Sequence, residues 1–251
     1  MYQLLKEQLA ATIHALRVTT FNRGNAVQRL IMALYATVIE QIDSAVALVD
    51  SGRSTGVEAI LRSCLEAHVD LLNLASDPAY ADQMQAHFHE QFRIVCREAI
   101  KGTNPFLAGI EADAPARLAE HEKELARLGK PLDTKTRFDM AGMSDIYRSI
   151  YNSLCCETHN NMRALMDRHF TNQGTDEIPI FQIAIFMGKV DFDAAIDTFL
   201  SILTGSNRTV HHYLGSDQLE KLEVYAQRRV EMPVATPVTA SVPAEQPPSH
   251  K

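Results

Sequence analysis

Long runs of apolar residues at helical spacing constrain the fold of this chain more than any other feature. Residues 56–77 and residues 143–165 are two such runs, and both carry polar side chains among the apolar ones. Residues 26–50 form a strongly apolar run, and residues 2–18 form an amphipathic one. Apolar side chains three and four positions apart line one face of a helix, so each run predicts a helix that packs into a core. The sequence therefore predicts an all-α protein, a multi-helix bundle of about seven to nine helices.

One segment departs from this pattern. Residues 178–187, IPIFQIAIFM, are rich in Ile and Phe. Such a short apolar run is compatible with a strand, an extended buried segment or a buried piece of helix, because periodicity does not separate these alternatives. An exposed strand there would attract a second strand, which makes a homo-oligomer one expected form of the protein.

The chain has 251 residues, of which 46% are hydrophobic, and this is enough to bury the core of one large domain. We expect a single helical domain over residues 1–230. Residues 231–251 combine prolines with small residues and contain no aromatic group. They bury too little apolar surface to offset the entropy of ordering, so the sequence predicts a disordered, proline-rich tail.

Charge and motifs limit the partners. The formal net charge of −7 and the lack of a Lys and Arg cluster argue against broad binding to a nucleic-acid backbone, but allow a small site for RNA or a nucleotide. There is no phosphate-binding loop, and the sequence indicates no cofactor and no specific partner. The four cysteines resemble no disulfide scaffold, and we see neither an export signal nor a membrane span. We therefore expect a cytoplasmic protein with reduced thiols.

Four polar side chains on the two mixed runs form the candidate catalytic site. Arg62 and Glu66 lie one turn apart on the first, and Tyr151 and His159 lie two turns apart on the second. In a catalytic interpretation Arg62 binds a phosphate, and His159 acts as the general acid or base. Glu66 then orients one of these groups, and Tyr151 donates a hydrogen bond. This interpretation requires the two helices to pack together.

Two other interpretations use the same helices. The first, which the acidic charge and the missing phosphate loop favour, is a structural or interaction module in which the same four residues form a buried polar network. Such a network would fix how the helices pack, because unpaired polar groups in a core cost about 1–3 kcal/mol each. The second is a zinc site, since two Cys and His pairs at four-residue spacing would supply four ligands. The pairs are Cys64 with His68 and Cys155 with His159.

Both runs resemble parts of a known family. The segment ILRSCLEAHVDLLNL resembles the L-x-R-S-x-x-E helix of a large, uncharacterised family of bacterial all-helical proteins. The segment MSDIYRSIYNSLCCETHNN resembles that family's second signature, Y-x-x-x-Y-x-x-x-S/C-x-x-x-H. The resemblance extends over residues 25–165. The residues that match are Arg62, Ser63, Glu66, Tyr147, Tyr151 and His159, with Ser153 or Cys155 at the serine position.

That family is similar to the HEPN class of helical bundles, which includes nucleotide-binding and ribonuclease-like domains. The resemblance implies a nucleotide-binding protein or a metal-independent ribonuclease, with a role in stress or phage defence by analogy. Active HEPN members use an arginine and a histidine separated by roughly four to six residues. Arg62 and His68 have this spacing, although His68 falls on the apolar face of its helix.

Overall fold

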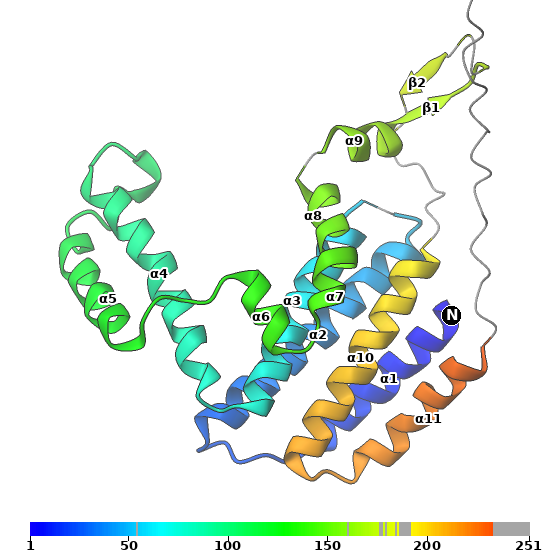
Figure 1. Ribbon diagram of the computed structural model, residues 1–251, viewed down its shortest axis with the longest axis horizontal. Helices are drawn as coiled ribbons and strands as arrows, with labels where there is room; N and C mark the ends of the chain where they lie inside the picture. Colours follow the sequence, from blue (N-terminus) through cyan, green and yellow to red (C-terminus); the bar gives the residue numbers. More distant parts are fainter. Residues whose placement is uncertain are drawn as a thin grey trace, which may run out of the picture.

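The computed structural model describes residues 1–53, 55–159, 161–175, 178, 180–183, 185 and 192–232. Most of these residues are helical, which confirms the predicted all-α, multi-helix fold (Figure 1). The first half of the chain contains α1 (Tyr2–Val18), α2 (Ala26–Asp50), α3 (Val57–Ser76), α4 (Tyr80–Ile100), the 3-10 helix η1 (Pro105–Leu107) and α5 (Ala114–Leu128). The second half contains α6 (Thr134–Met140), α7 (Ser144–Ile146), the π-helix η2 (Tyr147–Tyr151), α8 (Asn152–Thr158), α9 (Met162–His169), β1 (Phe170–Asn172), β2 (Phe181–Ile183), α10 (Asp193–Leu214) and α11 (Gln218–Glu231).

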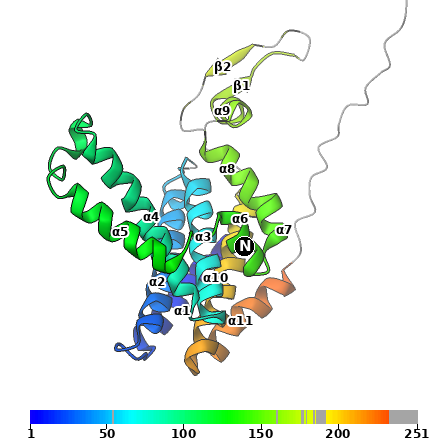
Figure 2. The ribbon, with the colours of Figure 1, turned by 60° about the vertical axis from the view of Figure 1, so that its left-hand side comes forward.

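Helices α1, α2, α3, α10 and α11 form the main bundle (Figures 1 and 2). Helix α2 packs along α3, and α10 lies against α1, α2, α3 and α11. Their apolar faces meet in one core, whose fully buried side chains include Leu4, Tyr35, Ile42, Leu65, Leu71 and Leu200. Each large aliphatic side chain buried in this way stabilises the fold by about 1.5–3 kcal/mol.

Helix α2 is long and apolar enough to cross a membrane by length and composition. In this structure Ile31, Tyr35, Val38 and Ile42 of α2 are fully buried in the core, and the core helix of a soluble protein meets the same criterion. The expected cytoplasmic location and the expected lack of a membrane span therefore stay predictions.

Helices α4 and α5 form a hairpin that projects away from the main bundle, and we call it the arm (residues 80–128) (Figures 1 and 2). Its two helices pack along each other around a small core of their own, made of Cys96, Ala99 and Ala114. A core of three small residues cannot cover the larger apolar side chains of the arm, and several of these stay at its surface.

The second mixed helix is shorter and less regular than the sequence predicts. A continuous helix over residues 143–165 is wrong, because the chain runs from α7 through the π-helix η2 into α8, which ends at Thr158. His159 follows as the C-terminal cap residue of α8, and α9 starts at Met162. The Asn161 side chain accepts a hydrogen bond from the backbone N–H of Arg163. This cap starts a new helix and explains the break.

A short antiparallel hairpin follows α9. Strand β2 pairs with β1, with Phe170 opposite Ile183, so an extended piece does occur within the apolar segment 178–187. Phe181 and Ile183 are 57% and 68% exposed, which rules out a buried extended segment or a buried helix at these positions. Residues 179, 184, 186 and 187 of the predicted segment lie outside the described residues.

The predicted tail, residues 231–251, lies outside the described residues from position 233 onward. Before it, α11 still packs against α1 and α10, and its Leu222 is buried. The division into a domain over 1–230 and a disordered tail stays a prediction.

Candidate functional site

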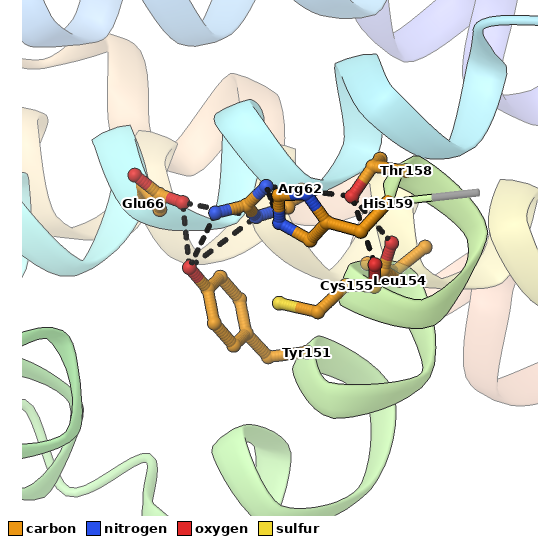
Figure 3. Close-up of polar contacts among 7 residues, drawn as sticks. All are labelled: Arg62, Glu66, Tyr151, Leu154, Cys155, Thr158 and His159. Atoms are coloured by element: carbon orange, nitrogen blue, oxygen red, sulfur yellow. Dashed lines mark hydrogen bonds and ion pairs between the residues drawn. The ribbon is translucent and has the colours of Figure 1, made fainter. Parts of the chain in front are cut away.

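Arg62 and Glu66 lie on one side of α3, one helical turn apart (Figure 3). Arg62 Nε is 3.4 Å from Glu66 Oε1, and 27% and 32% of the two side chains are exposed. Leu61 and Leu65 of the same helix are buried in the main core. The amphipathic pattern of α3 therefore places both charged groups at the edge of the bundle, next to α8.

Tyr151 joins the second mixed helix to this pair. It is the last residue of the π-helix and is only 4% exposed. Its hydroxyl donates a 2.7 Å hydrogen bond to Glu66 Oε1 and accepts from Nε and Nη2 of Arg62 at 3.3 Å each. Burial and the bond to Glu66 raise the pKa of Tyr151 to about 12. Tyr151 is therefore a protonated donor at neutral pH.

His159 and Thr158 face the outer end of the same guanidinium (Figure 3). Arg62 Nη1 lies 3.2 Å from His159 Nε2 and 3.4 Å from Thr158 Oγ1. Because a guanidinium only donates, a hydrogen bond between the two groups requires the Nε2 lone pair of His159 to accept. The His159 side chain is exposed, so a ligand in solution can reach it.

The structure thus brings Arg62, Glu66, Tyr151 and His159 together, and we call them the Arg62 cluster. The sequence-based expectation that these four residues are buried is wrong, because only Tyr151 is buried and His159 is exposed. Helix α8 ends at Thr158, next to Arg62, and His159 follows it at an exposed position. The Arg62 contacts of 3.2–3.4 Å exceed the roughly 2.7–2.9 Å of strong charge-assisted hydrogen bonds. A negatively charged ligand could displace contacts of this length and bind the guanidinium.

Comparison with protein families gives one match. A model described as a family of unknown function (DUF5677) matches residues 28–178, more than half of the chain. The chain belongs to this family. All four residues of the Arg62 cluster lie in the DUF5677 region. No curated protein and no solved structure matched the chain, and the expected HEPN likeness and bacterial origin stay predictions.

Within the DUF5677 domain, Arg62 and His68 do not act as a pair. His68 is 6% exposed, and its Nδ1 lies 2.8 Å from Ser206 Oγ on α10. Burial lowers the pKa of His68 to about 4. The histidine that meets Arg62 is instead His159, from a helix that is distant in sequence.

The four predicted zinc ligands do not converge. Cys64 is fully buried, with its sulfur 3.9 Å from the backbone oxygen of Val38 on α2, and His68 faces α10. Cys155 and His159 lie on the other side of α3, beside Arg62 (Figure 3). Over the described part of the chain, no group of three or more His, Cys, Asp or Glu side chains is placed to hold a metal.

A second charged cluster on α3 has no counterpart in the sequence-based predictions. Arg137 of α6 binds Asp70 through two bonds, Nε to Oδ1 at 2.9 Å and Nη2 to Oδ2 at 2.6 Å. The Tyr80 hydroxyl also donates to Asp70 Oδ1, at 2.6 Å, and only 14% of Arg137 and 18% of Asp70 are exposed. Although burial opposes its charge, the Asp70 carboxylate raises the pKa of Arg137. Arg137 lies 67 positions from Asp70, and no sequence pattern indicates that the two residues meet.

A third polar cluster is sealed inside the main bundle. The Tyr35 hydroxyl donates to Asn207 Oδ1 at 2.7 Å, and Asn207 Nδ2 donates to Thr12 Oγ1 at 3.0 Å. His211 Nε2 lies 3.3 Å from the Tyr35 hydroxyl, and all four residues are at most 2% exposed. The only sequence signal for this cluster was polar residues within apolar helical faces. It joins α1, α2 and α10 and is closed to any ligand.

Proposed function

We propose that the DUF5677 domain of this chain binds RNA through one phosphate at Arg62 and cleaves that phosphodiester without a metal. His159 would act as the general base. The observation that carries the proposal is the meeting of a partly exposed guanidinium with an exposed imidazole 3.2 Å away. Buried polar groups that hold helices together are typically paired within the protein and closed to solvent. Arg62, by contrast, is partly exposed, and His159 is exposed.

Arg62 suits the phosphate-binding role. A guanidinium binds phosphate through two parallel hydrogen bonds, and it stays charged at any physiological pH. Glu66 and Tyr151 hold one edge of the group through Nε and Nη2, while Nη1 points to the exposed side with His159. The π-helix that ends at Tyr151 also supports a functional site, because such turns are rare and occur often at functional positions.

His159 suits the role of base because of what a bound phosphate would displace. A phosphate oxygen on Nη1 of Arg62 would replace the contact to His159 and free the Nε2 lone pair. Nε2 would then take the proton of the ribose 2′-hydroxyl, O2′ would attack phosphorus, and the bond from phosphorus to O5′ would break. The leaving O5′ takes a proton from water. The products would be a 2′,3′-cyclic phosphate and a 5′-hydroxyl end.

The charge of the chain defines the kind of RNA binding to expect. With a net charge of −7, the protein cannot hold a long backbone, so contact with one phosphate should dominate. Binding to single strands should then weaken with salt by a slope of only about −0.7 per contact on logarithmic axes. This proposal takes up the HEPN-like interpretation, with His159 in place of His68.

The test is cleavage of an end-labelled, single-stranded RNA by the purified chain in the presence of a chelator. We expect products with 2′,3′-cyclic phosphate ends, and we expect His159→Ala to lower the rate by about 100-fold or more. His14→Ala is the matched control, because His14 is also exposed but lies on α1. Cleavage that persists in His159→Ala, or that disappears equally in His14→Ala, would show that the proposed base is wrong.

A second function, as an interaction module, is favoured by a separate observation. The arm carries large apolar side chains at its surface, among them Phe88 and Phe92. This surface lies on helices other than those that hold the Arg62 cluster, so the two functions are compatible.

A further inference from the structure

The arm exposes an apolar stripe along α4. Phe88, Phe92 and Val95 recur at helical spacing and are 50%, 46% and 37% exposed. The two phenyl rings are in contact, with centroids 4.6 Å apart, and the His121 ring of α5 stacks on Phe92 at 5.8 Å. Contiguous exposed apolar patches on a protein surface mark interaction sites.

The arm covers this stripe only in part, through the ring of His121. Its two helices pack around Cys96, Ala99 and Ala114, with Leu107, Ile110 and Leu118 at the margin. The arm stands away from the main bundle in both ribbon views (Figures 1 and 2). Two helices with so small a core gain stability when a further layer covers their apolar face.

We propose that a second copy of this chain covers the stripe, so that two arms pack into a four-helix bundle around a two-fold axis. A two-fold contact places the same surface on both sides, so the surface must be complementary to itself. With the axis near Gln91 and Phe92 and the two α4 helices antiparallel, Phe88 of one copy lies against Val95 of the other.

The charges on α4 favour a second copy over a charged partner. The exposed positions on the face of the stripe are Gln85, Phe88, Gln91, Phe92 and Val95, and none of them is charged. The flanking charges are paired within the arm, Glu90 with Arg93 and Arg97 with Glu122. Two copies therefore meet without opposing like charges.

The test is the mass of the full chain in solution, measured by light scattering and sedimentation over a wide concentration range. We expect twice the mass of one chain. Phe92→Glu places two carboxylates near the axis and should raise the dissociation constant of the dimer by about 100-fold or more. Ile94→Glu is the matched control, because Ile94 is 54% exposed on the same helix but points away from the stripe, and it should leave the dimer intact.

A second measurement tests the same contact if Phe92→Glu disturbs the folding of the arm. Gln91→Cys in a Cys156→Ser background should form an intermolecular disulfide under mild oxidation, because two copies of position 91 meet near the axis. A wild-type chain that stays monomeric at every concentration would overturn the proposal. So would a dimer that Phe92→Glu leaves unchanged, or one that fails to cross-link through position 91. These results do not depend on RNA cleavage, which concerns a different surface.

Discussion

Helix α3 carries two clusters that each combine an arginine, a carboxylate and a tyrosine, and the comparison between them separates structure from function. Near its C-terminal end, Asp70 binds Arg137 through two bonds of 2.9 and 2.6 Å, and Tyr80 adds a third of 2.6 Å. The carboxylate and the guanidinium are both more than four-fifths buried. Every short contact is made within the cluster, so a ligand would have to break one to enter.

Near the start of α3, Arg62, Glu66 and Tyr151 repeat this composition with looser geometry. The ion pair has a single contact of 3.4 Å, and the hydroxyl is 3.3 Å from the guanidinium nitrogens. An exposed histidine, His159, lies at the open end. An arginine, a carboxylate and a tyrosine can therefore either hold two helices together or present a charged group to solution. The length of their contacts and their exposure determine which of these two roles they have.

The largest expected effect is the difference in stability loss between substitutions of the two arginines. Arg137→Met leaves a buried Asp70 without its counter-charge, and we expect the free energy of unfolding to fall by about 3–5 kcal/mol. Arg62→Met removes a partly exposed pair and should cost less than about 1 kcal/mol. Urea unfolding followed by circular dichroism measures both. Equal losses would remove the distinction between a closed and an open cluster.

The next effect concerns His68, which is buried between α3 and α10. Burial holds the folded-state pKa of His68 near 4, below its ordinary 6.5, so the unfolded chain binds the additional proton between these values. The free energy of unfolding should therefore fall as pH decreases from 6.5 towards 4, by roughly 2–3 kcal/mol from this group. His68→Gln should lose that part of the pH dependence. A variant whose stability follows pH as the wild type does would contradict the sealed position of His68.

A smaller effect compares two tyrosine hydroxyls. Tyr35→Phe removes a group that contacts Asn207 and His211 inside the core, and leaving these buried partners unsatisfied should cost about 1–3 kcal/mol. Tyr151→Phe should cost about 1 kcal/mol or less, because Glu66 is partly exposed and can bond to water. Thermal unfolding of both variants ranks them. The reverse order would mean that the Arg62 cluster is a structural element.

Residue spacing was sufficient to predict the helices of the bundle. The run 26–50 has the same bounds as α2, and 56–77 differs from α3 by one residue at each end, because continuous apolar faces are a direct consequence of packing. The sequence also identified Arg62, Glu66, Tyr151 and His159 as potential partners. Their catalytic roles stay a proposal.

Residue spacing could not predict features that depend on local capping or on where distant segments of the chain meet. The helix break after Thr158 arises from a local cap at Asn161, which competes with an apolar pattern that continues across it. Arg137 reaches Asp70 across 67 positions, and no periodicity encodes such a pairing. The projection of the arm from the bundle likewise follows from tertiary packing alone (Figures 1 and 2).

The most direct test of the difference between the two clusters is the affinity of the chain for a fluorescent, single-stranded RNA, measured by anisotropy. We expect Arg62→Met to weaken binding by about 10-fold or more, since charge-assisted hydrogen bonds contribute roughly 1.5–3 kcal/mol. Arg208→Met is the control, because it removes the same charge from an exposed pair with Glu223, and it should bind RNA as the wild type does. Equal affinity of the wild type and Arg62→Met would show that the open cluster is not a phosphate site.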